Sequence, residues 1–360
     1  MLGGLDRRLH TPSLVCPSPG ALPDSIRAAG IDVRTVPYRG SSIWFVPSVW
    51  ARSPAVGRIE AALRELSPAV VHSDFHTLPF ALPACRRLGI PILFTCYGWW
   101  FRPRPWQRSF YRHGPRSILA ISEAVKQGFL GEPPFMPPDR IQVLHLGVDT
   151  DVFRPQPEVR EPVRRELGFE PDAPLITLLA RFQSVKGHEV FLRACRLLAQ
   201  QAPGVRMIIA GGNVFGRQSD ESFRRSVMAQ AEMDPLLRDR VRFTGWLERA
   251  DRVLAASDVV VCSSRFESFG MAVVEAMASG VPVVSTNVGG PAETVAEGET
   301  GYLVPPNRPD RIAACTLALL EDPPLRHRMG QAGRIRAVER FGLRRYADRF
   351  SAVMESLAAG

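Results

Sequence analysis

The sequence contains almost no lysine: among its 45 basic residues only Lys126 and Lys186 are lysines, and the rest are arginines. It also lacks any run of 18 apolar residues, so we expect no membrane-spanning helix. The start, MLGGLDRRLH, has no apolar centre like that of a signal peptide. The six cysteines form no CxxC pair, which argues against a disulfide framework or a zinc site and favours a reducing cytosol.

The composition is that of a globular protein, with 45% hydrophobic and 22% charged residues. It excludes a disordered chain, a collagen and a coiled coil. A length of 360 residues suits two domains. The net charge of +9 is uneven, because the stretch up to Pro155 has 18 basic and 11 acidic residues, whereas the remainder has 27 and 25. The N-terminal half therefore favours an anionic partner more strongly.

Short apolar runs alternate with amphipathic stretches, which predicts an α/β protein with parallel sheets covered by helices. We expect strands near 13–16, 33–37, 69–72, 91–95, 118–121, 141–145, 175–179, 205–210, 241–244, 259–262, 282–285 and 301–303. We expect helices near 22–29, 55–65, 79–88, 122–130, 189–200, 223–232 and 270–279, and a final helix pair over 323–357.

The prediction is two doubly wound, Rossmann-like domains that face a cleft, over residues 1–152 and 153–335, with a C-terminal helix over 336–360 that packs back toward the first domain. Residues 153–162 contain three prolines and much charge, which indicates a linker. The first domain is short at its N-terminal end, since Gly3 and Gly4 precede any expected strand. We therefore expect it to lack its first strand, either because the domain is abbreviated or because the sequence starts after that strand.

The segment from Arg265 to Gly290 combines several features of a ligand site. A strand is followed by a turn that opens a helix at Gly270, where free backbone N–H groups can bind phosphate or sugar hydroxyls. Glu275 is the only charged residue of that helix, and a ribose diol would satisfy its carboxylate. Glu267, eight residues earlier, could reach a second polyol. The alternative is that Glu275 caps a neighbouring helix and Glu267 is solvated.

A second cluster follows the buried strand LITLLA. Arg181 lies at the carboxyl end of that strand, and Lys186 with Gly187 opens the next helix. Ligands of open α/β sheets bind at this end of the strands. Two cations five residues apart would neutralise a diphosphate there; the alternative is a solvated loop before an ordinary helix.

These two segments resemble those of the retaining GT-B glycosyltransferases of family 4, also called group 1. Glu267 and Glu275 form the E-x7-E pair, and Arg181 and Lys186 match the family's basic pair. Further segments follow in the family's order between about Ser13 and Phe350: Gly147-Val148-Asp149, Phe153-Arg154-Pro155, Ala210-Gly211-Gly212, Phe243-Thr244-Gly245, Ala256 to Asp258 and Gly289-Gly290-Pro291-Ala292-Glu293.

The resemblance implies a donor-binding second domain and an acceptor-binding first domain. Arg181 and Lys186 would hold the donor diphosphate, Glu275 the ribose, and Glu267 the transferred sugar. The remaining donor-binding candidates are Ser268, Phe269, Gly270, Met271 and Gly211. The family uses no metal and no cofactor besides the nucleotide-diphosphate sugar, because cations and a helix N-terminus stabilise the departing nucleotide. Retention by front-face displacement would require neither carboxylate to act as a nucleophile.

The chain departs from the family's pattern at Tyr97, where relatives often carry an active-site histidine, and at Ala180, where they often carry glycine. Tyr97 can donate one hydrogen bond but is a poor base at neutral pH. His72, at the end of the preceding strand, either substitutes for the missing histidine in the active site or is a packed core residue.

Asp149-Thr150-Asp151 matches the metal-binding DxD motif of the other large glycosyltransferase class. Here it lies in the segment that resembles the family's entry into the linker. We therefore interpret Asp149 as a turn or cap residue and predict no metal site.

The stretch 98–116 is rich in aromatic residues and arginines and contains no acidic residue. Such a surface suits an anionic bilayer; the alternatives are stacking on single-stranded nucleic acid and ordinary core packing. The membrane-contact candidates are Trp99, Trp100, Arg102, Arg104, Trp106 and Arg108.

The function that the resemblance implies is transfer of a sugar from a nucleotide-diphosphate sugar to a lipid-linked or glycan acceptor in cell-envelope polysaccharide biosynthesis. We expect a cytoplasmic enzyme, peripheral on the inner face of the plasma membrane. The alternative is a catalytically impaired relic that binds nucleotide sugars or glycans. A nucleic-acid partner is disfavoured, because no recognition motif is present.

Overall fold

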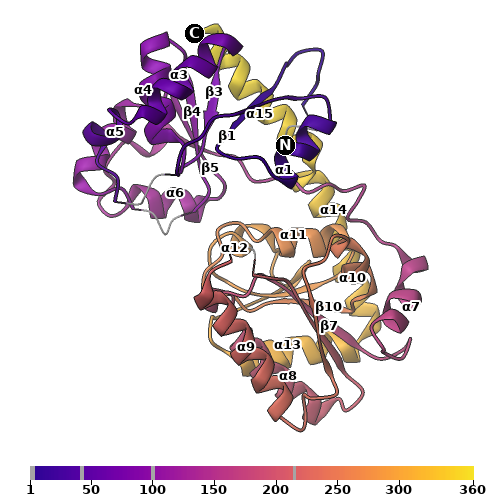
Figure 1. Cartoon of the computed structure of the whole chain (residues 1–360). Coiled ribbons are helices and arrows are strands. Elements are labelled where there is room, and N and C mark those ends of the chain that lie inside the picture. Colours follow the sequence, from indigo (N-terminus) through magenta and orange to yellow (C-terminus); the bar gives the residue numbers. More distant parts are fainter. Residues whose placement is uncertain (1–4, 41–43, 99–101, 214–215) are drawn as a thin grey trace. The chain divides into compact units, whose positions relative to one another are not determined.

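The computed structural model describes residues 5–40, 44–98, 102–213 and 216–360. It contains two compact units (Figure 1): the first unit is Met1–Gly147 with Leu343–Gly360, and the second unit is Val148–Gly342. These boundaries differ from the expected ones at 152/153 and 335/336. The second difference has a simple cause, since position 335 lies inside the continuous helix α14 (Pro323–Phe341), and the chain leaves the second unit only after that helix ends.

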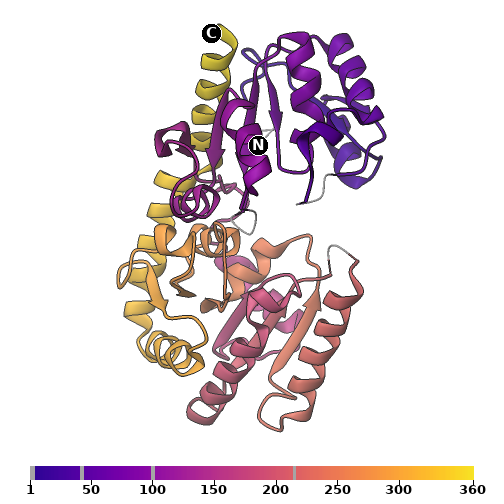
Figure 2. The same ribbon diagram turned by 90° about the vertical axis from the view of Figure 1, so that its left-hand side faces the viewer.

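The second unit is built on a parallel six-stranded sheet of order β12-β11-β10-β7-β8-β9. Helices lie on both of its faces (Figures 1 and 2). Its strands are β7 (Leu175–Leu179), β8 (Arg206–Ala210), β9 (Val241–Gly245), β10 (Val259–Cys262), β11 (Val283–Thr286) and β12 (Gly301–Val304). Its other helices are α7 (Pro157–Glu166), the 3-10 turn η3 (Ser184–Lys186), α8 (His188–Gln201), α9 (Gln218–Met233), α10 (Ala250–Ala256), α11 (Met271–Ala278), α12 (Pro291–Thr294) and α13 (Pro309–Glu321).

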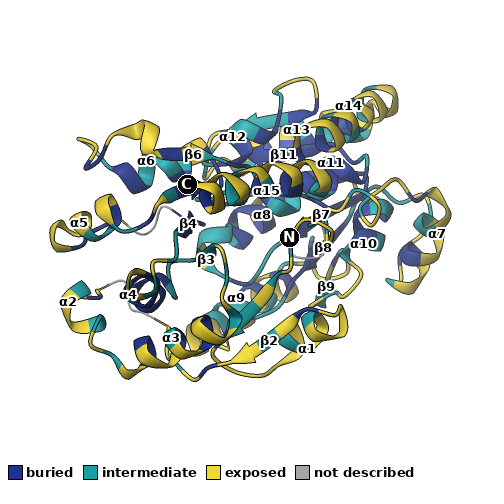
Figure 3. Cartoon of the chain, turned by 90° about the horizontal axis from the view of Figure 1, so that it is seen from above, coloured by how far each residue is buried: buried dark blue, intermediate teal, exposed yellow. Residues whose placement is uncertain are grey.

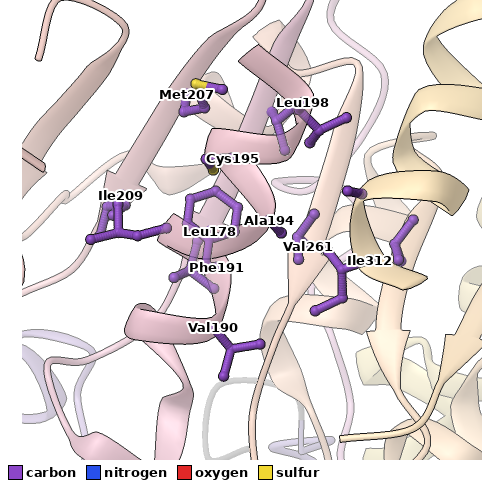
Figure 4. Close-up of a cluster of buried hydrophobic side chains, with 14 of the residues drawn as sticks. Leu178, Val190, Phe191, Ala194, Cys195, Leu198, Met207, Ile209, Val261 and Ile312 are labelled. Carbon is purple, nitrogen blue, oxygen red and sulfur yellow. The ribbon is translucent and has the colours of Figure 1, made fainter. Parts of the chain in front are cut away.

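The core of this unit follows from the two-residue period of its strands. Ile176 and Leu178 of β7 pack with α8 and α13 in the larger hydrophobic cluster (Figure 4). Leu175, one residue out of phase, lies in a smaller cluster with Val163 of α7 and Val253 of α10. Because successive strand side chains point to opposite faces, an uninterrupted apolar strand such as LITLL is buried on both sides.

The first unit contains two separate parallel sheets, β1-β2 and β3-β4-β5-β6. Its strands are β1 (Ser13–Cys16), β2 (Asp32–Thr35), β3 (Val71–Ser73), β4 (Ile92–Cys96), β5 (Ser117–Ala120) and β6 (Ile141–Val143). Its helices are α1 (Ala21–Ala28), α2 (Pro47–Trp50), α3 (Pro54–Leu66), α4 (Leu78–Leu88), α5 (Pro105–His113), α6 (Glu123–Leu130), the 3-10 turn η2 (Pro138–Arg140) and the C-terminal α15 (Leu343–Ala359). Tyr346 and Phe350 of α15 pack on Leu93 and Leu119 of the sheet.

A cavity separates β1 from β3, so the two sheets of the first unit do not pair with each other. This cavity of about 650 Å³ is lined by Leu14 of β1 on one side and by Val71 and His72 of β3 on the other. In the second unit the corresponding position between the two halves of the sheet is filled by β7, which pairs with both β8 and β10. Among the residues that the structure describes, the first unit has no strand at this position.

The expected strands coincide with the twelve strands of the described residues, but several helices were not expected. The expected linker over 153–162 is mostly helix α7, because Pro157 occupies the first helical position, where a missing N–H costs nothing, and Val163 packs into the core. Helices α5, α10 and α13 were also not predicted. Within the described ranges, no helix is both long enough and apolar enough to cross a membrane.

Candidate functional site

The predicted donor residues gather at the carboxyl ends of β7 and β10, where the loops 180–187 and 263–270 meet. The Arg265 N–H donates to the Val185 carbonyl at 2.8 Å, and the Ser263 hydroxyl donates to the Gly187 carbonyl at 3.0 Å. Gly187 has φ of +71°, and a Cβ there would lie 2.0 Å from the Ser263 carbonyl oxygen. Only glycine permits this close approach, so Lys186 and the following loop are held in one arrangement.

Lys186 and Glu267 form an ion pair across these two loops. Lys186 Nζ lies 2.6 Å from Glu267 Oε2, and the Ser264 hydroxyl donates to the same oxygen at 3.2 Å. Their side chains are only 16% and 15% exposed. The ammonium group carries three N–H donors, so two remain for an anionic ligand while one stays on Glu267. The interpretation of Glu267 as a solvated residue is therefore wrong.

The N-terminus of α11 is fixed by glycines. Gly270, with φ of +88°, precedes the helix, and its carbonyl accepts from the N–H groups of Val273 and Val274. The Gly290 N–H donates to the Glu267 carbonyl at 3.0 Å, and a Cβ at Gly290 would lie 2.3 Å from Phe269 Cα. The loop that carries Ser268 and Phe269 thus rests directly on the Gly289–Gly290 turn. The first amides of α11 have no acceptor within the helix and can serve an anion.

Glu275 is a carboxylate without a partner. It lies on α11, and burial raises the pKa of its carboxyl group to about 7. Burial is the only cause of this shift, and within the described part of the chain no hydrogen bond or helix cap involves the Glu275 side chain. The alternative of a helix cap therefore fails.

Arg181 and Gly211 meet at the end of the β7–β8 pair. Arg181 follows β7 directly, and the Gly211 backbone packs on the carbonyl of Ala180 so closely that a Cβ would lie 2.0 Å from that oxygen. Gly211 thereby fixes the backbone next to Arg181 and contributes to the site through this packing.

The two candidates of the first unit, His72 and Tyr97, are partly buried. His72 Nε2 lies 2.8 Å from the Thr95 hydroxyl, and its ring packs edge-on against Phe350 at 5.1 Å. Burial lowers the pKa of His72 to about 4, which favours the packed alternative. Tyr97 follows β4, and burial raises the pKa of its hydroxyl well above the usual value, so it cannot act as a base.

The aromatic–arginine stretch divides into a surface and a core. Trp99 and Trp100 lie outside the described residues. Arg102, Arg104 and Arg108 are exposed, and Trp106 is 50% exposed. Figure 3 shows exposed positions along α5. In contrast, Tyr111 packs edge-on against Phe45 and Phe129, so core packing is correct for that ring.

The surface part of this stretch includes residues that sequence reasoning missed. The Arg104 guanidinium lies 4.2 Å from the centroid of the Trp44 ring. Trp44, Val46 and Val49 are all largely exposed. Their signal in the sequence, the apolar run SIWFVPSVW, resembles that of a buried segment.

Asp149 forms a turn, as the interpretation of the DxD motif predicts. Its Oδ1 accepts from the N–H groups of Asp151 and Val152 at 3.0 and 3.2 Å. Among the residues for which coordinates are described, no three His, Cys, Asp or Glu side chains gather as a metal site would require.

Comparison with protein families matches both units. The model described as "Glycosyl transferases group 1" matches residues 159–336, and the model "Glycosyltransferase Family 4" matches residues 1–152. The α-maltose-1-phosphate synthase of Mycolicibacterium smegmatis is 30% identical over 344 residues, which are 87% of this chain and 86% of that protein. The chain belongs to this glycosyltransferase family.

Other relatives of this glycosyltransferase are matched over a shorter range. The D-inositol 3-phosphate glycosyltransferase of Thermobispora bispora is 34% identical over 220 residues, 60% of this chain and 50% of that protein. The chain thus spans about half the length of the inositol 3-phosphate relatives it matches.

Solved structures support the GT-B fold. A Rickettsia africae glycosyltransferase has a TM-score of 0.83 at 21% identity. The match covers 97% of this chain and 90% of that protein. Anabaena HepE, solved with UDP and glucose, has a TM-score of 0.80 at 21% identity, covering 95% and 91%.

Proposed function

We propose that this chain transfers a sugar from a nucleotide-diphosphate sugar to an acceptor, with retention of configuration and without a metal ion. The observation that carries the proposal is the site itself: the Lys186–Glu267 pair at the N-terminus of α11, with the unpartnered Glu275 in the same helix. A departing nucleoside diphosphate gains negative charge in the transition state. Fixed cations and helix N–H groups stabilise that charge without a metal.

The residues take separate roles in this proposal. Glu275 accepts the two ribose hydroxyls, Arg181 and Lys186 hold the diphosphate, and Glu267 contacts the transferred sugar. The ion pair supports retention by front-face displacement. Glu267 Oε2 already accepts from Lys186 and Ser264, and a carboxylate engaged in this way is a weak nucleophile.

A donor panel tests the proposal. We would incubate the chain with UDP-, GDP- and ADP-sugars and measure protection from thermal unfolding and release of the nucleotide; HepE was solved with UDP-glucose, so that donor comes first. Protection together with acceptor-dependent release is the expected result. Protection without release under any acceptor would instead favour the relic that only binds nucleotide sugars.

The acceptor that we propose is a lipid-linked or glycan intermediate of cell-envelope polysaccharide. Two relatives are named for inositol 3-phosphate and maltose 1-phosphate, so the acceptor panel includes inositol 3-phosphate and glucose 1-phosphate beside lipid-linked saccharides in vesicles. Turnover with the small phosphates alone would contradict the lipid-linked or glycan acceptor while leaving the transferase intact.

Membrane contact through the first unit is part of this proposal. Exposed rings at Trp44 and Trp106 beside Arg102, Arg104 and Arg108 suit the interface of an anionic bilayer. The protein should sediment with vesicles that contain phosphatidylglycerol and stay free with neutral vesicles, and binding should weaken as salt rises.

A triple variant and a matched control test this surface. Replacing Arg102, Arg104 and Arg108 by Ser should release the protein from anionic vesicles. A control triple, with Arg27, Arg58 and Arg64 replaced by Ser, removes the same charge from other exposed positions of the first unit. Equal loss of binding in both triples would show that net charge, and no specific surface, governs the contact.

A further inference from the structure

The first unit has a second cavity at the opposite end of its larger sheet from Tyr97. It has a volume of about 800 Å³ and lies near the amino ends of β4, β5 and β6. Its walls come from the last turns of α4, α5 and α15 and from the loop before β5. Nothing in the proposed transfer reaction uses this end of the sheet.

Cations dominate the wall of this cavity. Four arginines and one histidine line it, and among the described residues its lining contains no Asp or Glu side chain. The cationic residues are Arg86, Arg112, Arg116 and Arg140, and the histidine is His113. All four arginines are exposed to solvent, and the only acidic group in the described lining is the carboxylate of the last residue, Gly360, so the lining carries a net positive charge that favours an anion.

The hydrogen bonds of these arginines leave most of their donors available. Arg86 Nη2 donates to the His113 carbonyl at 3.0 Å, Arg112 Nη2 to the Phe135 carbonyl, and Arg116 Nη2 to Gly360 O at 3.4 Å. Each bond uses one of five N–H groups, and it orients the guanidinium without an Asp or Glu partner. Oriented guanidinium groups of this kind match the planar, bidentate geometry of phosphate.

The lining of the cavity also includes apolar side chains. Leu82, Cys85, Ile92 and Leu357 line it and are buried. A lining that combines arginines with apolar side chains fits a ligand that carries a phosphate group on an uncharged organic part.

We propose that this arginine-lined cavity is a binding site for phosphate-bearing ligands, separate from the donor site. The phosphate group lies between the guanidinium groups of Arg86, Arg112, Arg116 and Arg140. The ligand is either a soluble phosphoester or the headgroup of an anionic lipid, which share this chemistry. The inference does not rest on the proposed transferase activity.

Titration with inorganic pyrophosphate tests the site. Because the donor site also has cations for a diphosphate, we would use the full chain with both Arg181→Ala and Lys186→Ala as the background and follow binding by calorimetry. We expect pyrophosphate to bind this background. The double variant Arg86→Gln/Arg140→Gln should bind it at least about tenfold more weakly, as expected when charge-assisted hydrogen bonds are lost.

Three controls keep the test specific. Arg52→Gln/Arg58→Gln removes two exposed arginines elsewhere in the first unit, and Arg58, like Arg86, donates to a backbone carbonyl. This pair should bind pyrophosphate as the background does. Arg86→Lys/Arg140→Lys should restore part of the affinity, because charge returns without the planar fork. In an otherwise wild-type chain, Arg86→Gln/Arg140→Gln should leave the unfolding temperature and UDP-glucose binding unchanged.

Vesicles decide between the two sources of phosphate. Displacement of pyrophosphate by vesicles of phosphatidylglycerol, but not of phosphatidylcholine, identifies a lipid headgroup; displacement by glycerol 3-phosphate alone identifies a soluble phosphoester. Failure of the background to bind pyrophosphate, or equal affinity in the Arg86/Arg140 and Arg52/Arg58 variants, would overturn the proposal.

Discussion

The raised pKa of Glu275 makes both stability and donor binding depend on pH. Burial raises the pKa of its carboxyl group from 4.5 to about 7. The folded chain therefore keeps a proton on Glu275 over a range in which the unfolded chain has released it. The stability that this proton contributes is fully present below pH 4.5 and is lost as the pH rises toward 7.

The size of this effect follows from the shift. At 1.36 kcal/mol for each pKa unit, ionised Glu275 destabilises the folded second unit by about 3 kcal/mol above pH 7. Glu275→Gln keeps the shape and removes the charge. It should raise the free energy of unfolding by up to about 3 kcal/mol at pH 8 and by much less at pH 5. Urea unfolding of both proteins at several pH values measures the difference.

The affinity for the donor should rise with pH, whereas the stability contributed by the Glu275 proton falls as the pH rises. Ribose hydroxyls donate to the ionised carboxylate and favour that form, so binding releases a proton near pH 7. Because the ionised fraction of a group with a pKa of about 7 rises roughly tenfold between pH 6 and pH 8, affinity for UDP-glucose should rise by about the same factor. UDP-glucose is the appropriate probe, since its diphosphate does not titrate in this range.

Calorimetry in two buffers of different ionisation enthalpy measures the affinity and the released proton together. Glu275→Gln should bind UDP-glucose with an affinity that is weaker and independent of pH. A wild-type affinity that is flat between pH 6 and pH 8, or a Gln variant that retains the slope, would refute the assignment of Glu275 to the ribose.

The other predictions concern the chemistry of the donor site. Lys186→Ala should lower turnover about a hundredfold or more, with a smaller effect on nucleotide binding, since the leaving-group charge grows toward the transition state; unchanged turnover would contradict this role. Arg181→Ala should act alike, and the double variant should be less than additive in steady-state kinetics because both cations serve one diphosphate. Glu267→Ala should chiefly lower turnover, whereas Glu275→Ala should chiefly raise the Michaelis constant of the donor, and identical profiles would disprove the division. Activity should survive EDTA, and a loss that magnesium reverses would show a metal requirement.

The donor segments could be predicted because their chemistry is local. A buried strand, a glycine turn and a helix start can each be recognised from a few consecutive residues. The segment with Gly270 and Glu275 and the segment with Arg181 and Lys186 contain only such local signals. The Lys186–Glu267 pair could not be found in this way, because its partners are 81 residues apart in the chain. Only the parallel pairing of β7 with β10 brings the two loops together.

The first unit was harder to predict for a different reason. In the stretch 98–116, Trp106 and Tyr111 have similar chemistry in the sequence, yet one is 50% exposed and the other is buried. Which face of α5 is covered depends on Phe45, Phe94 and Phe129, which come from distant segments. Trp44 and Val49 show the converse, since both are exposed although they belong to an apolar run that would pass for a strand.

The ion pair also changes how the charge of the donor site is counted. Lys186 was expected to bring a full positive charge to the diphosphate, but Glu267 neutralises it at a distance of 2.6 Å. The pair as a whole contributes little net charge, so the net attraction for a diphosphate falls to Arg181 and to the N-terminus of α11. What the pair supplies is orientation, because Glu267 and Ser264 hold one side of the ammonium group and direct its other N–H groups outward. A cation held in this way need not reorganise as the leaving group gains charge, and preorganised donors of this kind lower the barrier more than mobile ones do.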